Sequence, residues 1–323
     1  MTIFFFFDSP KVNVIDKGYS RHVTHNGGWG AIMQHVEKRL DDKRARVSFV
    51  DCSEHYFLWN KNVLMTPWIG IVHYVDDLPR RIYPRFETLE GLVSSSSFQQ
   101  SIRYCIGIIV LSNASVQKMR EYTPSVPVLS IPHPIGLKCD PTHIGIVSRK
   151  FRWVVLLGQQ YRKVATIYNL RTPLRKIWLP GMDPRRPKSD RRLREMVERE
   201  GILYNRTDVS IWYVNNNVYR HVLSKSIVIV DLWDASANNA VMDAISCKIP
   251  ILINRLPAVE EYIGKDYPLY FTDFESLQKK VDSLRPHDMA RAQEYLRSLD
   301  TDSMSVERFT DNIVRAVRTF TRK

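Results

Sequence analysis

The sequence predicts an α/β protein made of two Rossmann-like, doubly wound domains that face one another across a cleft. Short runs of β-branched and aromatic residues alternate with stretches of helical periodicity, an order typical of parallel sheets covered by helices on both faces. The alternation stops in residues 136–148, where Pro, Gly and polar residues gather, and then begins again. The chain of 323 residues is also long enough for two domains of ordinary size.

The first domain is expected in residues 1–140. The opening MTIFFFFDSP predicts a buried first strand, because its apolar run is too short for a membrane span and lacks the basic flank of a secretory signal. The loop HNGGWG and a helix in AIMQHVEKRLDD follow it. The later strands are expected in RVSFVDC, WIGIVHY, GIIVLS and VPVLS, with helices in FQQSIRYC and ASVQKMREYT.

The second domain is expected in residues 148–300. Strands are predicted in RWVVLLG, KIWLPG, DVSIWYV, IVIVDL, ILIN and LYF. Helices are predicted in YRKVATIYNL, in the basic stretch near residue 190, in VYRHVLSKS, in NNAVMDAISC and in LPAVEEYIG. No repeat of solenoid period is visible.

The last segment, residues 301–323, predicts an amphipathic helix. Its apolar stripe consists of Val306, Phe309, Ile313, Val317 and Phe320. We expect this helix to pack back on the body of the protein and to cross to the first domain. A helix that lies on a membrane surface shows the same basic amphipathic pattern and is the alternative.

The net charge of +13 permits nucleic acid, anionic membrane surfaces or phosphorylated ligands as partners. Much of this charge lies in residues 171–199, where basic residues alternate with Glu as on a solvated helix; a docking patch is the alternative reading. No zinc finger, helix-turn-helix or RNA-binding aromatic pattern accompanies the basic residues, so a nucleic-acid partner is not expected. A polyanion-binding protein and peripheral membrane contact remain alternatives.

The cysteines stand alone in the sequence. None has the spacing of a metal site, and their pattern indicates no disulfide framework, so we expect a reducing compartment such as the cytoplasm. They are Cys52, Cys105, Cys139 and Cys247.

The segment ASANNAVMDAISCKIPILIN carries the strongest candidate site. It lies between two continuous apolar runs, so it predicts a strand, loop, helix and strand in which the loop and the first helical turn face a binding crevice. Ser236, Asn238 and Asn239 supply donors there, and Asp243 is placed one turn deeper to accept hydrogen bonds from ribose hydroxyls. The alternative is that Ser236 and Asn238 only cap the helix and that Asp243 is solvated.

Six stretches, in this order, resemble glycosyltransferases of the GT-B fold, and the second half is most similar to the family 4 type of retaining, sugar-nucleotide-dependent transferases. They cover most of residues 20–275 and are HNGGWG, TPWIGIVH, CIGIIVLS, VPVLSIPHP, LLGQQYRK and DASANNAVMDAISCKIPILINRLPAVEEYIG. The resemblance implies transfer of a sugar from a nucleoside diphosphate to a hydroxyl of a glycan or glycoprotein acceptor, with the donor held mainly by the second domain.

The resemblance also assigns donor-binding residues. Arg162 and Lys163 match the paired cations that neutralise the diphosphate, and Asp243 matches the acid that holds the ribose. At the position of the family's first acid the chain has Ala235, with Asp234 directly before it, and this departure leaves the retaining assignment open. Preorganised cations and helix N–H groups stabilise a leaving diphosphate without a metal, so we expect no required metal ion and no cofactor beyond the sugar nucleotide.

Another departure from the family is Lys248, which stands where the family commonly has Gly.

The catalytic candidates are His73, Asp77 and Asp234. His73 ends the strand WIGIVH and resembles the family's His near the donor sugar, and Asp76 and Asp77 follow it closely. If the enzyme inverts, His73 or one of these two acids is the general base on the acceptor side; if it retains, no such base is required. The alternative for His73 is an ordinary packed residue.

Two further positions complete the expected donor site. Gly28, in the glycine cluster of HNGGWG, would let the backbone approach the diphosphate, although such a cluster also forms plain tight turns. Val214 closes a strand of the second domain and would border the base. A sugar-nucleotide-binding or glycan-binding module that has lost catalysis is the rival function, because of Ala235.

Overall fold

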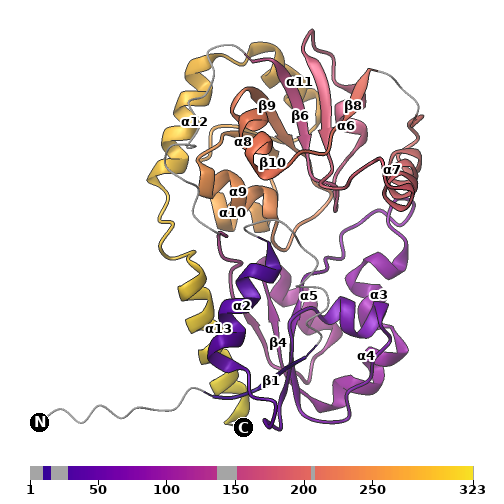
Figure 1. The fold of residues 1–323 in the computed structure, drawn as a ribbon, viewed down its shortest axis with the longest axis vertical. Coiled ribbons are helices and arrows are strands. Elements are labelled where there is room, and N and C mark those ends of the chain that lie inside the picture. Colours follow the sequence, from indigo (N-terminus) through magenta and orange to yellow (C-terminus); the bar gives the residue numbers. More distant parts are fainter. Residues whose placement is uncertain (1–9, 16–27, 137–150, 205–207, 323) are drawn as a thin grey trace, which may run out of the picture. The chain divides into compact units, whose positions relative to one another are not determined.

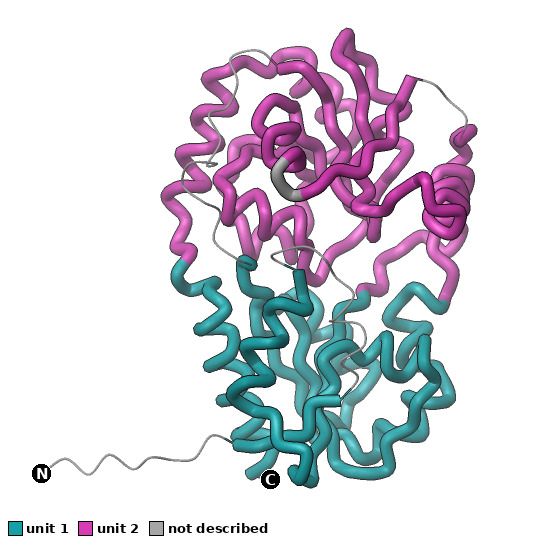
Figure 2. The backbone as a smooth tube through the Cα atoms, viewed as in Figure 1, with its two compact units in different colours: residues 1–74, 86–136, 302–323 teal, residues 75–85, 137–301 magenta. Residues whose placement is uncertain are grey.

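The computed structural model describes residues 10–15, 28–136, 151–204 and 208–322. The chain divides into two compact units (Figure 2). Unit 1 consists of Met1–Tyr74, Phe86–Gly136 and Asp302–Lys323, and unit 2 consists of Val75–Arg85 and Leu137–Thr301. The last segment therefore belongs with unit 1, and the short segment Val75–Arg85 belongs with unit 2 although it lies within the first half of the sequence. The expected strand in the Phe run lies outside the described residues.

Within its described residues, unit 1 contains a sheet of five parallel strands whose spatial order follows the chain. The strands are β1 (Asn13–Ile15), β2 (Ser48–Val50), β3 (Trp68–Val72), β4 (Cys105–Val110) and β5 (Val128–Ser130). The helices are α2 (Trp29–Leu40), η1 (Glu54–Trp59), η2 (Arg85–Glu87), α3 (Leu89–Val93), α4 (Ser96–Ser101), η3 (Ile102–Tyr104), α5 (Ala114–Tyr122) and α13 (Val306–Thr321).

Helices cover both faces of this sheet. On one face, strand residues such as Trp68 and Ile108 pack with Phe57 of η1, Phe98 of α4 and Met119 of α5. On the other face, α13 packs beside α2 and against β4 (Figure 1).

The helix α13 uses its apolar stripe for this packing. Phe309, Ile313, Val317 and Phe320 are all buried. A Cβ atom at Gly107 of β4 would lie 2.3 Å from the Phe320 ring, so only glycine allows this close approach. The expectation that the C-terminal helix packs back on the first domain is confirmed. The alternative in which the same stripe lies on a membrane is wrong, because the stripe is already covered by protein.

In the part of unit 2 that the structure describes, six parallel strands form a sheet in the order β11-β10-β9-β6-β7-β8. They are β6 (Trp153–Leu157), β7 (Arg175–Leu179), β8 (Val209–Ile211), β9 (Ser226–Val230), β10 (Ile251–Asn254) and β11 (Tyr270–Phe271). The chain builds outward from β6 to β8, returns to β9 on the other side of β6, and continues to β11. The order therefore reverses between β6 and β9, which is the switch point where ligands bind in doubly wound sheets.

Both faces of this sheet are also covered. The helices are α6 (Ala165–Asn169), α7 (Pro187–Arg199), α8 (Asn216–Ser224), α9 (Asn239–Cys247), α10 (Pro257–Ile263), α11 (Phe274–Ser283) and α12 (Pro286–Ser298). Residues of α6, α7 and α11 pack in one core with Val154 and Ile229. Val155 and Val230 point to the opposite face, since side chains alternate along a strand, and they are fully buried as well.

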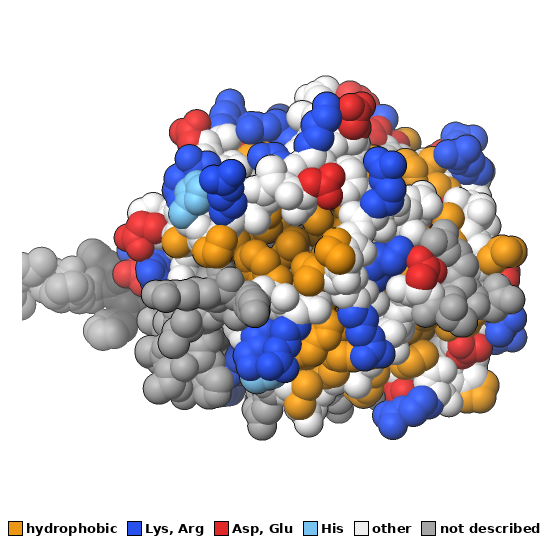
Figure 3. Space-filling model, turned by 90° about the horizontal axis from the view of Figure 1, so that it is seen from above, with side chains coloured by type: hydrophobic (Ala, Val, Ile, Leu, Met, Phe, Trp, Pro, Cys, Tyr) orange, Lys and Arg blue, Asp and Glu red, His pale blue; other side chains and the backbone are white. Residues whose placement is uncertain are grey.

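The basic residues of α7 lie on a solvated helix, as the mixed charges predict. Arg194 pairs with Asp190 at 3.7 Å, and Arg199 pairs with Glu195 at 3.7 Å, both along α7. On the face shown in Figure 3, Lys and Arg side chains lie in separate groups, with acidic side chains among them and an apolar area at the centre. Among the described helices, none is both long and apolar enough to cross a bilayer.

The cysteines differ from the expectation at one position. Cys52 and Cys105 are free thiols, but Cys247 at the end of α9 is disulfide-bonded. The expectation that the cysteines form no disulfide is therefore wrong for Cys247, and the reducing compartment no longer follows from the cysteine pattern.

Candidate functional site

The candidate site of unit 2 lies at the carboxyl ends of β6 and β9, where two loops are joined. Arg162 in the first loop and Leu232 in the second form an antiparallel bridge, and the N–H group of Lys163 donates to the carbonyl of Asp231 at 2.9 Å. Asn254, at the end of β10, uses its side-chain amide both to accept from the N–H group and to donate to the carbonyl of Leu232, each at 2.8 Å. These bonds hold the loops at the switch point in one conformation.

Arg162 is buried, and its side chain links the two loops through hydrogen bonds. Its side chain donates to the carbonyl of Leu157 at 2.6 Å, to the carbonyl of Gln160 at 2.8 Å and to Oδ1 of Asn238 at 2.9 Å. The residue is only 3% exposed, and burial lowers the pKa of its guanidinium to about 10. Gly158 makes room for it, because a Cβ there would lie 2.5 Å from Nη2. Arg162 thus uses three of its side-chain nitrogens, Nε, Nη1 and Nη2, in hydrogen bonds within the protein.

Lys163 is the more exposed of the two predicted cations. Its side chain is 31% exposed, and Nζ lies 3.4 Å from Asp231 Oδ1 and 5.3 Å from the centre of the Trp233 ring. Asp231 is buried and also accepts from the Thr166 hydroxyl at 2.7 Å. Burial raises the pKa of Asp231, and Lys163 and Thr166 oppose that shift. The structure therefore presents a cation, backed by a carboxylate, at the mouth of the switch point.

The helix α9 begins at the loop to which Arg162 is bonded. Asn238 is its N-cap and accepts from the N–H group of Ala240 at 3.0 Å, while the same oxygen accepts from Arg162. Asn239 is the first residue of the helix and is exposed, whereas Ser236 in the preceding loop is buried. The capping role considered for Asn238 is confirmed. The positive end of the α9 dipole lies at this loop and favours an anion.

Asp243 lies one turn into α9 and is half-buried. Its Oδ2 accepts from the Tyr219 hydroxyl of α8 at 3.3 Å, and burial together with this carboxylate raises the pKa of Tyr219. The tyrosine orients the carboxylate that was predicted to hold a ribose. Val214, in contrast, follows β8 at the outer edge of the sheet, with β7 between it and β6.

Asp77 and Asp234 are brought together within unit 2. The N–H group of Asp77 donates to Oδ2 of Asp234 at 3.3 Å, and Oδ1 of Asp234 accepts from the N–H group of Ala235 at 2.7 Å. Burial raises the pKa of Asp234, and the neighbouring carboxylates Asp77 and Asp76 raise it further. Asp76 and Asp77 were expected on the acceptor side as bases; both belong to unit 2 instead, because segment Val75–Arg85 packs there.

His73 lies in unit 1, directly after β3, beside a buried carboxylate. Glu54 Oε1 accepts from the N–H groups of His73 at 2.5 Å and Tyr74 at 2.7 Å, and Oε2 lies 3.3 Å from His73 Nδ1. Burial alone would raise the pKa of Glu54, but the His73 imidazole and the backbone N–H groups of Glu54 and Tyr74 outweigh it and lower that pKa. Glu54 thus fixes the orientation of the imidazole.

Gly28 also belongs to unit 1, where it caps the N-terminus of α2 with ordinary extended backbone angles. The next residue, Trp29, packs edge-on against the His73 ring with centroids 4.6 Å apart. Its further ring neighbours are Phe309, at 5.9 Å, and His133, at 5.5 Å, whose burial lowers its pKa to about 4. The structure therefore places Trp29 next to His73.

Several residues of these sites were missed by the sequence analysis. Asp231 ends the apolar run IVIVDL, and an acid at the carboxyl end of a buried strand was a usable signal. Glu54 follows one strand as His73 follows the next, so their proximity was also inferable. For Tyr219 and Asn254 no sequence signal existed, because their partners come from other elements.

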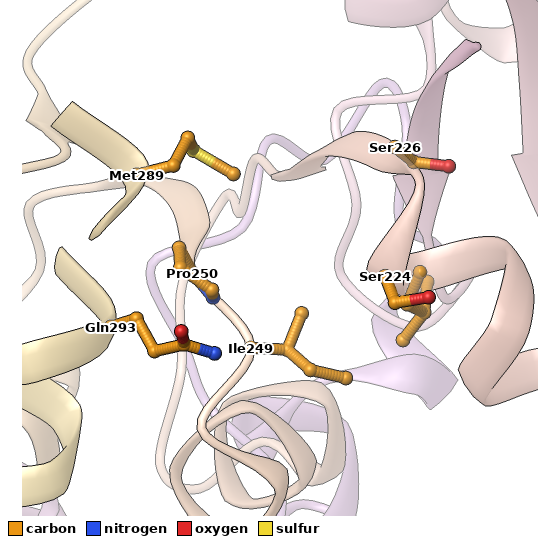
Figure 4. A pocket seen from close by; sticks show the side chains of 7 residues that line it. Ser224, Ser226, Ile249, Pro250, Met289 and Gln293 are labelled. Carbon is orange, nitrogen blue, oxygen red and sulfur yellow. The ribbon is translucent and has the colours of Figure 1, made fainter. Parts of the chain in front are cut away.

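A small pocket lies elsewhere in unit 2 (Figure 4). It is lined by Leu223, Ser224, Ser226, Ile249, Pro250, Met289 and Gln293. Ser226 begins β9 and Pro250 directly precedes β10, so the pocket opens at the amino ends of the strands, opposite the switch point. It is not part of the candidate site.

Comparisons with known proteins extend the structural description. No family model matches the sequence, and no curated protein sequence matches it. Sucrose-phosphate synthase from Thermosynechococcus elongatus has a similar structure, with a TM-score of 0.60, 12% identity, and coverage of 90% of this chain and 76% of that chain. HepE from Anabaena, in complex with UDP-glucose, has a TM-score of 0.57 at 12% identity, covering 89% and 82% of the two chains.

A third similar structure is α,α-trehalose-6-phosphate synthase from Burkholderia multivorans. Its TM-score is 0.57 at 11% identity, and the match covers 85% of this chain and 70% of that chain. At such low identity the similarity concerns the fold. The predicted fold class is confirmed: the chain has the GT-B fold of these glycosyltransferases, with a Rossmann-like sheet in each of its two units.

Proposed function

We propose that the protein transfers a sugar from a nucleoside diphosphate to a hydroxyl of a glycan or glycoprotein acceptor, and that unit 2 holds the donor. One observation carries the proposal: the loop after β6 carries an accessible cation, Lys163, and its Arg162 bonds the N-cap of α9 at the switch point between β6 and β9. A diphosphate is the ligand that this pairing favours.

The leaving nucleoside diphosphate gathers negative charge as the glycosidic bond breaks. Lys163 and the N–H groups of α9 would stabilise that charge, each well-placed donor contributing about 3 kcal/mol to the barrier reduction. Arg162 would act indirectly, by holding Asn238 and the loop. Asp243, oriented by Tyr219, would accept from the ribose hydroxyls. These groups supply the electrostatic stabilisation within the protein, and no required metal ion is part of the proposal.

The stereochemical course proposed is retention, as in the resemblance to the family 4 type. A structurally similar trehalose-6-phosphate synthase, with a TM-score of 0.54 and 8% identity, has been analysed as an enzyme of glycosyl transfer with retention, which supports this choice. Asp234 would then face the donor sugar in place of the acid that Ala235 replaces. If the product is inverted, His73 with Glu54 is the better candidate base.

The test is a thermal-shift screen with UDP, GDP, ADP and their sugars, because a ligand that binds the native state raises its stability. UDP is the first choice, since the similar HepE structure contains UDP-glucose. We expect one nucleoside diphosphate to raise the midpoint for the native protein and for Lys279→Ala, whose side chain is exposed on α11. The Lys163→Ala and Asp243→Ala variants should lose most of the shift. Equal shifts in all four proteins would overturn the proposed donor site.

A second candidate is a binding module without catalysis, favoured by Ala235 at the position of the family's first acid. Slow release of free sugar from a bound nucleotide sugar separates the two functions. A transferase hydrolyses its donor slowly when no acceptor is present, whereas a binding module returns the donor intact.

A further inference from the structure

Three potential metal ligands meet in unit 1: Cys52, Glu54 and His73, here called the Cys52–Glu54–His73 cluster. Cys52 and Glu54 follow β2 closely, and His73 directly follows β3. The two strands are parallel neighbours, so their carboxyl ends lie side by side. One donor atom from each residue, sulfur, oxygen and nitrogen, lies within 4.8 Å of the other two.

Two of the three separations between the donor atoms already resemble those around a tetrahedral ion. Cys52 Sγ lies 3.5 Å from Glu54 Oε2, and His73 Nδ1 lies 3.3 Å from the same oxygen. Bonds of about 2.0–2.3 Å to a tetrahedral Zn²⁺ place neighbouring ligand atoms roughly 3.3–3.6 Å apart. An ion could therefore bind with little rearrangement of the carboxylate.

The surroundings hold the ligands in place. Glu54 Oε1 accepts from two backbone N–H groups, those of His73 and Tyr74, which leaves Oε2 directed at the thiol and the imidazole. Trp29 packs edge-on against the imidazole. Such supporting contacts orient the ligands of natural metal sites.

Burial and access also fit a bound ion. Cys52 is 6% exposed and the Glu54 side chain 2%, whereas the His73 side chain is 23% exposed and offers a route from solvent. A thiolate, an imidazole and one carboxylate suit Zn²⁺ or Co²⁺ rather than Mg²⁺ or Ca²⁺, which prefer oxygen ligands alone.

We propose that the Cys52–Glu54–His73 cluster binds one divalent transition-metal ion of the Zn²⁺ class through Sγ, Oε2 and Nδ1, with a fourth position open to water. Binding forms metal bonds to Sγ, Oε2 and Nδ1, releases the thiol proton to solvent and shifts the imidazole proton from Nδ1 to Nε2, and no electron is transferred. The ion replaces the hydrogen bonds that the thiol and imidazole make to Oε2.

One consequence rests on the proposed function. The ion occupies Nδ1 of His73 and so fixes an imidazole that the family resemblance places near the donor sugar. The bound metal would therefore inhibit transfer, and a chelator would restore it.

The direct test uses Co²⁺ and needs neither donor nor activity. Co²⁺ added to the full chain under argon should give a sulfur-to-cobalt charge-transfer band and intense tetrahedral d–d bands, saturating at one ion per chain. Zn²⁺ should displace the cobalt and raise the unfolding midpoint. The Cys52→Ser variant should lose the charge-transfer band. Cys105→Ser should keep it, because Cys105 lies in β4 and its Sγ donates to the Gly107 carbonyl at 3.4 Å, outside the cluster.

A second variant guards against misfolding of Cys52→Ser. His73→Gln should weaken Co²⁺ binding at least tenfold while keeping the metal-free unfolding midpoint close to that of the native protein. A charge-transfer band that is absent from the native protein, or that survives in Cys52→Ser, overturns the proposal. The hydrogen-bonded cluster without metal is then the correct description.

Activity measurements separate this proposal from the proposed function. With a working donor and acceptor, Cys105→Ser should be inhibited by Zn²⁺ like the native protein, whereas Cys52→Ser should need at least tenfold more Zn²⁺. A saturable cobalt spectrum in a protein that neither binds nor turns over any sugar nucleotide would support the metal site and count against the transferase.

Discussion

At the scale of single residues, adjacent side chains with the same charge have different tasks. Arg162 is buried and bonded to two carbonyls and an amide oxygen, whereas Lys163 is partly exposed beside Asp231. The resemblance treats the two as an equivalent pair of cations. Their geometry gives Arg162 a structural role and leaves Lys163 as the candidate ligand-binding cation.

This division predicts different effects on stability. Arg162→Ala should lower the free energy of unfolding by about 3 kcal/mol, because it leaves buried acceptors without donors. Lys163→Ala should lower it by about 1 kcal/mol, since Asp231 keeps the Thr166 hydroxyl as a partner. Urea denaturation of both variants measures the difference. Equal losses would show that Arg162 has no special structural role.

Asp234 predicts a pH dependence. Its raised pKa means that the native state holds this proton more tightly than the unfolded chain does, so the native protein loses stability as the pH rises from about 4 through the raised pKa. Asp234→Asn cannot ionise and escapes this loss. The stability of the variant relative to the native protein should therefore improve between pH 4 and pH 7. Urea titrations at several pH values would reveal the trend; a constant difference would contradict it.

At the scale of elements, α8 and α9 both end in a lysine C-cap, but the two lysines have different backbone conformations. Lys248 caps α9 with φ 52°, a left-handed conformation that favours glycine, and Lys225 caps α8 with φ −111°. The departure from the family's glycine at Lys248 therefore concerns backbone strain. Lys248 compensates in part, because its Nζ donates to the carbonyl of Leu296 at 3.0 Å.

The C-caps supply a matched pair of variants. Lys248→Gly should stabilise the protein by about 0.5–1 kcal/mol, because relief of the left-handed strain exceeds the loss of one partly exposed hydrogen bond. Lys225→Gly should destabilise it by about 0.5–1 kcal/mol, since glycine there only adds freedom to the unfolded chain. Thermal unfolding checks both signs, and destabilisation by Lys248→Gly would mean that the bond to Leu296 dominates.

At the scale of the whole molecule, the chain passes between its two units more often than a simple two-domain reading predicts. Val75–Arg85 leaves the first half to join unit 2, and residues 302–323 return to unit 1 as α13. Each unit therefore contains parts that are distant in the sequence. The residues of the proposed donor site all belong to unit 2.

Calorimetry should resolve this organisation. The nucleoside diphosphate identified in the thermal-shift screen should raise the unfolding temperature of unit 2. At a hundredfold excess over Kd it should add about 2.7 kcal/mol to the free energy of unfolding of unit 2 and leave that of unit 1 nearly unchanged. Removal of residues 302–323 should lower the unit 1 transition, because it uncovers the α2 and β4 surface that α13 buries. If the ligand and the truncation act on the same transition, this assignment of the donor to unit 2 is wrong.

The sequence predicted much of this architecture for a physical reason. IVIVDL and ILIN are rich in β-branched residues, which is typical of a strand buried on both faces, and the structure has β9 and β10 there. The apolar stripe of residues 306–320 predicted the amphipathic helix α13 in the same way. The helices α11 and α12, by contrast, were not expected, and the roles of the site residues stay predictions until ligand binding is measured.

What the sequence determined by itself was local: which segments form strands and helices, and which polar residues stand at their ends, because periodicity and capping act between near neighbours in the chain. Only the tertiary structure decided what these residues meet. Strand order placed Lys163 against Asp231 and assembled a thiol, a carboxylate and an imidazole whose spacing along the chain indicated no metal site. The packing of Val75–Arg85 in unit 2 separated Asp77 from the unit of His73. Such contacts depend on which strands become neighbours, and that is settled by the packing of the whole sheet.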